Sequence, residues 1–171
     1  MTNPVVPESL EFELVWDRQT DEIREAAISY WAQQNILPAG TTPEERCNEL
    51  LMLVRDHQQQ RVIGVATATL YRLPEIGEVF YRYRNHVIPD IRFQLIGTQL
   101  VIAGFEQLEA INGALGTPEA VGMYLEIENL ALMRARNYGI WPNSRFSYIG
   151  RTSAGWDRRI RYFAGARQGT T

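Results

Sequence analysis

Hydrophobic and polar residues follow two different periods in the first part of the chain. Residues 10–17, LEFELVWD, alternate apolar and polar side chains, and this alternation predicts a half-buried strand. The apolar residues that follow recur at helical spacing as far as about Asn35, behind a candidate N-cap at Thr20 or Asp21. We therefore expect a strand and then a helix, preceded by a loose lead-in over residues 1–9.

A second helix is expected soon after the first, because Thr42 is followed by a proline at what would be the first helical position. The apolar side of this helix would carry Cys47, Leu50 and Leu51. Cys47 is the one cysteine of the chain, so no intrachain disulfide can form. Its place on an apolar helix face predicts a buried thiol.

Strand patterns dominate the rest of the chain. β-Branched and aromatic residues predict strands over residues 52–56, 62–73, 78–88, 121–128, 145–150 and 158–164. Helices are expected after the third and the fourth of these strands. The order β-α-α-β-β-β-α-β-α-β-β predicts an α/β fold, of the α+β kind with a mixed sheet, in a single domain over residues 10–171. The strand-helix-strand unit within residues 78–128 should join parallel strands by a right-handed crossover.

The composition is ordinary for a soluble protein, with 45% hydrophobic and 22% charged residues among 171. No apolar stretch approaches the length that crosses a bilayer, and the N-terminus lacks the regions of a signal peptide. We therefore expect a cytoplasmic protein without a membrane partner. The net charge of -3 does not favour nucleic acid as a partner. Two histidines and one cysteine, not clustered, predict no metal site.

The segment 87–100, VIPDIRFQLIGTQL, passes from a strand through a proline to the start of a helix. A turn that ends at a helix N-terminus points several backbone N–H groups at one spot, and a diphosphate can bind there. Arg92 is placed to reach a phosphate or to brace the turn. The candidate donors are the N–H groups of Gln94, Leu95, Ile96, Gly97 and Thr98. A turn that only connects the strand to the helix is the alternative.

This segment and the order of elements resemble the GNAT superfamily of acyl-CoA-dependent N-acyltransferases. The family pattern V-x-P-x-x-R-x-x-G-x-G/A-x-x-L is matched by Val87, Pro89, Arg92, Gly97 and Leu100. Leu95 stands where the family usually has its first glycine. The resemblance implies that acetyl-CoA or another acyl-CoA binds at the turn. It also implies that a backbone N–H near Val87 or Ile88 polarises the thioester carbonyl.

Two further site residues are implied by the resemblance. Asn129 follows the expected strand 121–128, where the family commonly has an asparagine that touches the cofactor, and a helix N-cap is the alternative for this residue. Tyr138 is the candidate acid for the leaving thiolate, two residues beyond the usual position, which Arg136 occupies here. An aromatic residue that ends a helix and packs on the sheet is the alternative for Tyr138.

Two carboxylates and one histidine are candidates for taking a proton from the acceptor amine. Strand alternation puts Glu126 and Glu128 on one face, together with Tyr124. A solvated strand face, or pairing with arginines, is the alternative. His86 precedes Val87 near the expected cofactor path and belongs to a residue type that titrates near neutrality. A packed or surface histidine is the alternative there.

The sequence therefore predicts direct transfer of an acyl group from acyl-CoA to the amine of a small molecule or protein, without metal. One alternative is a GNAT-like domain without catalysis that acts as an acyl-CoA-binding or protein-interaction module. Another is an N-acyl synthase whose C-terminal arginines dock an acyl carrier protein. A homodimer is also expected if an aromatic-rich final strand lies at a sheet edge, because that edge could pair with a second copy.

Overall fold

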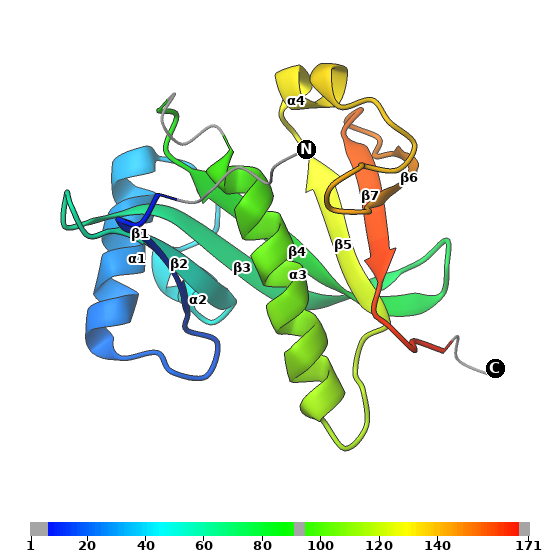
Figure 1. Cartoon of the computed structure of the whole chain (residues 1–171), viewed down its shortest axis with the longest axis horizontal. Coiled ribbons are helices and arrows are strands. Elements are labelled where there is room, and N and C mark those ends of the chain that lie inside the picture. Colours follow the sequence, from blue (N-terminus) through cyan, green and yellow to red (C-terminus); the bar gives the residue numbers. More distant parts are fainter. Residues whose placement is uncertain (1–6, 91–94, 168–171) are drawn as a thin grey trace. The chain divides into compact units, whose positions relative to one another are not determined.

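The computed structural model describes residues 7–90 and 95–167. Its strands are β1 (Leu10–Leu14), β2 (Leu50–Asp56), β3 (Arg61–Leu73), β4 (Glu78–Val87), β5 (Gly122–Ile127), β6 (Ser147–Arg151) and β7 (Asp157–Tyr162). Its helices are α1 (Asp21–Gln34), α2 (Pro43–Cys47), α3 (Ile96–Ala114) and α4 (Leu130–Ala135). This order of elements, labelled in Figure 1, confirms the predicted α/β fold.

In the parts of the chain that the structure describes, seven strands form one sheet in the order β1-β2-β3-β4-β5-β7-β6. β4 and β5 run parallel, as predicted for the two strands of the crossover unit. β2 pairs antiparallel with β1 and β3, and β7 pairs antiparallel with β5 and β6, so the sheet is mixed. The expectation that the last strand lies at an edge is wrong, because β6 takes the edge and β7 lies between β5 and β6.

The chain packs as two compact units. The first unit holds the residues up to Ala68 together with Asn85–Gly104. The second unit holds Thr69–Arg84 together with the residues from Phe105 onward. β4 and α3 each contribute residues to both units.

In the first unit, α1 begins and ends where its sequence predicts. The Thr20 hydroxyl oxygen accepts a hydrogen bond from the Ile23 N–H at 3.3 Å, which satisfies a donor that the first helical turn leaves without a partner. Asn35 ends the helix in the left-handed conformation, with φ at 52°. Tyr30 packs in the core with Cys47, and burial raises the pKa of that thiol. The predicted buried cysteine is therefore confirmed.

The second helix is shorter than its apolar pattern suggested. A capping box starts it, in which Thr42 and Glu45 each bond the other's backbone N–H, but α2 ends after five residues. Leu50 and Leu51, which were expected on this helix, belong to β2 instead. The run from Leu50 to Val54 is buried at every position. A continuous apolar run also suits a strand with both faces covered, and pairing with β1 and β3 decides between the two structures.

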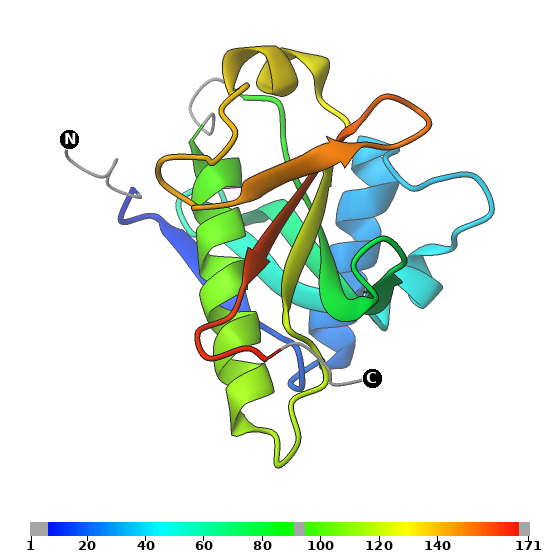
Figure 2. The ribbon, with the colours of Figure 1, turned by 90° about the vertical axis from the view of Figure 1, so that its right-hand side faces the viewer.

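The second unit is built around aromatic side chains. Phe105 of α3 packs against Phe146 and Phe163, with ring centroids 6.0 and 5.3 Å apart. Figure 2 shows β6 and β7, in orange and red, next to β5 in yellow. β5 is buried on both faces, because Tyr124 is as inaccessible as its neighbour Met123 on the other face. The face of β5 that carries Tyr124 is therefore covered at this residue and not open to solvent.

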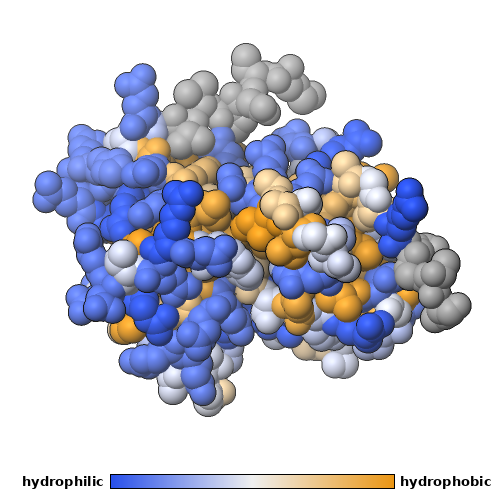
Figure 3. Space-filling view, turned by 90° about the horizontal axis from the view of Figure 1, so that it is seen from below, coloured by the Kyte–Doolittle hydropathy of each residue, from blue (hydrophilic) through white to orange (hydrophobic). Residues whose placement is uncertain are grey.

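Polar residues cover much of the face drawn in Figure 3, with apolar residues between them. The large apolar side chains exposed in the described residues are Leu70, Leu95, Leu115, Leu130, Tyr138, Ile140, Tyr148 and Tyr162. Within residues 7–90 and 95–167, no helix is both long and apolar enough to cross a membrane.

Candidate functional site

The first turn of α3 contains the candidate phosphate-binding residues. Gly97 is the second residue of this helix, and a Cβ atom added to it would meet no described atom within 4 Å. Gly97 is also absent from the described glycines with positive φ. Among the described residues, neither packing nor a positive φ requires a glycine at this position. The space that the described atoms leave beside Gly97 suits a ligand.

Leu95 stands at the position of the family's usual first glycine, and its side chain is 49% exposed. The leucine side chain is therefore not part of the packed core. The predicted turn residues Arg92 and Gln94 lie outside the described residues.

The N–H groups of this turn differ in their partners. Thr98 and Gln99 donate theirs to the carbonyl oxygen of Leu95, at 3.1 and 3.2 Å. The N–H groups of Ile96 and Gly97 have no acceptor within residues 7–90 and 95–167. If an anion binds at the helix N-terminus, the N–H groups of Ile96 and Gly97 are the candidate donors, whereas the Thr98 N–H already donates to Leu95.

The end of β4 is joined directly to this turn. The Asn85 side-chain amide donates a hydrogen bond to the carbonyl oxygen of Gly97 at 3.0 Å. Further along, the Ile88 N–H donates to the carbonyl oxygen of Ile63 in β3, at 2.9 Å. Since successive N–H groups of a strand point to opposite edges, the N–H of Val87 points away from β3. Of the two positions predicted to polarise a carbonyl, Val87 is therefore the better placed.

Glu126 belongs to a polar cluster in the second unit. Its Oε1 accepts a hydrogen bond from the Tyr124 hydroxyl at 2.7 Å, and its Oε2 is paired with the guanidinium of Arg82. Burial raises the pKa of Tyr124, and the bond to Glu126 raises it further, so the phenol is a proton donor at neutral pH. Both oxygens of Glu126 are engaged, whereas Glu128 is exposed. This arrangement favours a structural role for Glu126.

Asn129 and Tyr138 flank the short helix α4. Asn129 caps the helix, because its Oδ1 accepts a hydrogen bond from the Leu132 N–H at 3.0 Å. Tyr138 lies beyond the end of α4 and is 56% exposed, so it is not packed as a buried aromatic. Both belong to the second unit with Glu126 and Glu128, whereas Val87, Ile88 and the α3 turn belong to the first.

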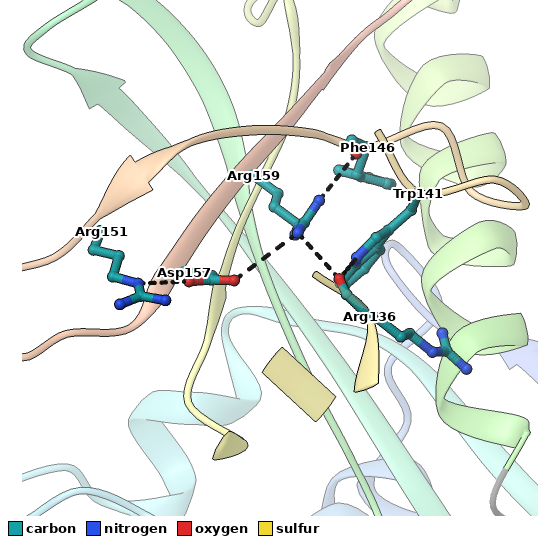
Figure 4. Close-up of polar contacts among 6 residues, drawn as sticks. All are labelled: Arg136, Trp141, Phe146, Arg151, Asp157 and Arg159. Carbon is teal, nitrogen blue, oxygen red and sulfur yellow. Dashed lines mark hydrogen bonds and ion pairs between the residues drawn. The ribbon is translucent and has the colours of Figure 1, made fainter. Parts of the chain in front are cut away.

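A buried arginine in the second unit was not among the predicted site residues. Arg159 is 1% exposed and donates to the carbonyl oxygens of Phe146 and Arg136, at 3.4 and 3.3 Å (Figure 4). Its guanidinium lies 4.5 Å from the ring centre of Trp141. The Trp141 indole N–H donates to the same carbonyl oxygen of Arg136 at 2.9 Å. Arg159 therefore ties together two parts of the segment that precedes β6.

The charge of Arg159 is balanced by Asp157, whose carboxylate oxygen lies 3.9 Å from the guanidinium. The other oxygen of Asp157 accepts a hydrogen bond from Arg151 Nε at 3.0 Å (Figure 4). The density of arginines near the end of the sequence was visible, but nothing in the sequence distinguished the buried one. The tertiary structure identifies Arg159 as the buried arginine, because its guanidinium packs against the ring of Trp141.

In the first unit, a buried tyrosine holds a histidine. The Tyr30 hydroxyl oxygen lies 2.6 Å from Nδ1 of His86. Burial raises the pKa of Tyr30 and lowers the pKa of His86, so both groups are neutral at pH 7. The sequence marked His86 as a candidate proton acceptor but did not indicate its contact with Tyr30, which lies 56 positions earlier.

No group of three or more His, Cys, Asp or Glu side chains that could hold a metal ion occurs in the described part of the chain.

The fold has counterparts among solved structures, although no family model and no curated protein matches the sequence. A ribosomal-protein-S5-alanine acetyltransferase from Vibrio fischeri is similar with a TM-score of 0.62 and 11% identity, over 96% of this chain and 98% of that chain. A mutant AtaT toxin bound to the C-terminus of the antitoxin AtaR and acetyl-CoA gives a TM-score of 0.52 and 15% identity, over 91% and 94%.

A GNAT family acetyltransferase from Brucella melitensis in complex with acetyl-CoA is similar with a TM-score of 0.50 and 13% identity, over 93% of this chain and 91% of that chain. At such low identities the similarity concerns the course of the chain. It agrees with the order of elements and the mixed sheet described above. The chain therefore has the fold of the GNAT acetyltransferases.

Proposed function

We propose that this protein transfers an acyl group from an acyl-CoA, with acetyl-CoA as the first candidate, to an amine. The observation that carries the proposal is the first turn of α3, where Gly97 adjoins open space and the N–H groups of Ile96 and Gly97 have no acceptor in the described residues. A helix N-terminus of this kind suits the diphosphate of CoA. Acetyl-CoA in the Brucella melitensis and AtaT complexes supports the same donor here.

The reaction needs groups that act on the thioester as well as a site for the diphosphate. Charge builds on the carbonyl oxygen during attack by the amine, and the N–H of Val87 can stabilise it. The leaving thiolate needs a proton, for which the exposed hydroxyl of Tyr138 is the candidate donor. The acceptor is an amine of a small molecule or a protein.

A second candidate function is an acyl-CoA-binding module without catalysis. It is favoured by the hydrogen bonds that occupy Glu126 and by the capping role of Asn129, since both predicted site residues already have structural partners. Such a module would bind acyl-CoA and release no CoA when amines are added. Thiol release with a panel of amines, including peptides with free N-termini, distinguishes the two functions.

Calorimetric titration with acetyl-CoA tests the donor site. We expect micromolar affinity, which corresponds to about -8 kcal/mol. Gly97→Trp should abolish binding, because the side chain would fill the space beside the turn. Gly113→Trp is the matched control, since Gly113 lies in the same helix, is exposed, and likewise has no described atom within 4 Å of an added Cβ. Thermal unfolding of both variants verifies that they fold.

The titration has two outcomes that would contradict the donor site. Absence of binding at millimolar acetyl-CoA would mean that the turn only joins β4 to α3. Equal affinity of the Gly97→Trp and Gly113→Trp variants would place the ligand elsewhere.

A further inference from the structure

His86 is held from one side only. Its Nδ1 lies 2.6 Å from the hydroxyl oxygen of Tyr30, while no residue in the described ranges forms a hydrogen bond with its Nε2. Tyr30 is 3% exposed and comes from α1, so the contact connects the helix to the end of β4. The ring is partly buried.

The single proton of the Tyr30 hydroxyl has three acceptors within reach. Besides the ring nitrogen, the carbonyl oxygens of Ile63 and His86 lie 3.3 and 3.2 Å from the hydroxyl oxygen. If Tyr30 donated its proton to Nδ1, neither carbonyl oxygen would accept a hydrogen bond from the Tyr30 hydroxyl. If His86 donates its Nδ1–H to Tyr30 and Tyr30 donates to one of the carbonyl oxygens, two of the three contacts are hydrogen bonds instead of one. The second arrangement leaves Nε2 without a proton, as a base.

Backbone packing keeps this end of β4 in place. A Cβ atom on Gly64 of β3 would lie 3.2 Å from the carbonyl oxygen of His86 and 3.1 Å from a methyl carbon of Val54. The glycine therefore allows β3 to lie close to the main chain of His86. On α1, Tyr30 is the titratable group that faces the histidine, and on β3 the main chain of Ile63 faces it. Burial is the cause that lowers the pKa of His86, without a contribution from a charged group among the described residues.

The position of His86 relates it to the α3 turn. Its neighbour Asn85 contacts Gly97, and strand alternation directs His86 to the opposite face of β4. One face of this short stretch therefore meets the candidate diphosphate site, while the next side chain offers a nitrogen lone pair on the other face. The N–H of Val87, the candidate donor to a thioester carbonyl, follows directly in the chain.

We propose that His86 is the base of acyl transfer, held by Tyr30 as the Nδ1–H tautomer so that Nε2 takes a proton from the attacking ammonium group. This step rests on the proposed function. The freed amine forms a C–N bond with the thioester carbon, and the C–S bond breaks. The nitrogen of the acceptor then loses a second proton, which reaches the CoA thiolate directly or through a donor. His86 releases to solvent the proton that it took. Tyr30 is a positioning residue in this scheme.

The tautomer can be measured without substrate by long-range ¹⁵N NMR of the imidazole rings at neutral pH. The chain contains only two histidines, so the spectrum has two ring systems. His57→Gln identifies which is which, because that exposed ring is bonded only to Glu11, at 2.7 Å, among the described residues. We expect a protonated Nδ1 and a bare Nε2 in His86, and a mixture of tautomers in Tyr30→Phe. A protonated Nε2 in the native protein would overturn the proposal.

Kinetics with acetyl-CoA and a responsive amine test the role in transfer. His86→Gln should lower kcat roughly 100-fold, within the range for loss of a general base, with unchanged affinity for acetyl-CoA by calorimetry. His57→Gln should keep the native rate. Tyr30→Phe should move the acid limb of the pH–rate profile, which loss of packing alone would not do. An unchanged kcat in His86→Gln would overturn the proposal while the donor site stands. Failure of the native protein to bind acetyl-CoA would instead remove the proposed function, and the base with it, even if the tautomer is as expected.

Discussion

His86 in the first unit and Glu126 in the second were both candidates for proton transfer, but they have different surroundings. Both oxygens of Glu126 are occupied, one by Tyr124 and one by Arg82. His86 has a partner at one ring nitrogen and, among the described residues, none at the other. A carboxylate with both oxygens bound resists giving up those bonds to receive a proton, whereas a histidine held at Nδ1 has a free lone pair at Nε2.

The comparison teaches that strand position alone does not identify a catalytic group. Both side chains occupy positions near the carboxyl ends of the parallel strands β4 and β5. What separates them is the number of hydrogen-bonding sites that the fold leaves unused. Three substitutions and one pH titration test this difference.

The largest effect is expected from Arg159→Leu, which tests whether the saturated polar groups of the second unit are structural. The substitution removes the buried one of the two arginines that pair with Asp157, leaving only the exposed Arg151, and it removes the donor to the carbonyl oxygens of Phe146 and Arg136. We expect the free energy of unfolding in urea to fall by about 3 kcal/mol. Arg134→Leu, on an exposed position, is the control and should change it by less than about 0.5 kcal/mol. Equal stabilities of the two variants would contradict a structural role for Arg159.

Glu126→Gln addresses the second candidate base directly. The side chain keeps its size but loses its ion pair with Arg82, so the free energy of unfolding should fall by about 1.5–3 kcal/mol. If Glu126 is structural, the pH–rate profile of acyl transfer should keep its shape in the folded variant. Loss of transfer at unchanged stability would reverse the comparison and make Glu126 the base.

Tyr30→Phe should cost less, because it removes one hydroxyl from a buried ring without creating a large cavity. The lost hydrogen bonds predict a fall of about 1 kcal/mol in the free energy of unfolding. Tyr162→Phe is a matched control, since that ring is 42% exposed, and its stability should be nearly native. A Tyr30→Phe variant as stable as the control would mean that the hydroxyl makes no net contribution to holding His86.

The smallest effect is expected in the pH dependence of stability. Burial lowers the pKa of His86 below its usual value of about 6.5, so the unfolded chain binds a proton more readily than the folded chain. The stability that neutral, buried His86 contributes is therefore fully present above about pH 6.5. It is lost as the pH falls through the pKa of His86 in the folded protein. The difference in the free energy of unfolding between the native protein and the His86→Gln variant should become smaller as the pH falls from about 6.5 to below that pKa. A constant difference between pH 8 and pH 5 would show that His86 is not neutralised by burial.

Local sequence patterns determined much of the fold. Thr20 and Asn35 mark the ends of α1 as caps, and Thr42 starts α2, because capping depends on side chains within three or four residues of the backbone groups that they satisfy. The predicted parallel pairing of β4 and β5 was correct, since a strand-helix-strand connection has one favoured geometry. The spacing of Arg92 and Gly97 also indicated a phosphate turn, which stays a prediction.

Only the tertiary structure decided properties that depend on contacts between distant parts of the chain. Leu50 and Leu51 belong to a strand because β1 and β3 pair with its two edges and so satisfy its backbone hydrogen bonds. β7 became an interior strand because β6 pairs outside it. A sequence shows which side chains can donate or accept a hydrogen bond, but not which of those sites another residue occupies. Arg82 occupies one oxygen of Glu126, and Tyr30 contacts one nitrogen of His86, because folding brings together side chains that lie 44 and 56 positions apart in the sequence.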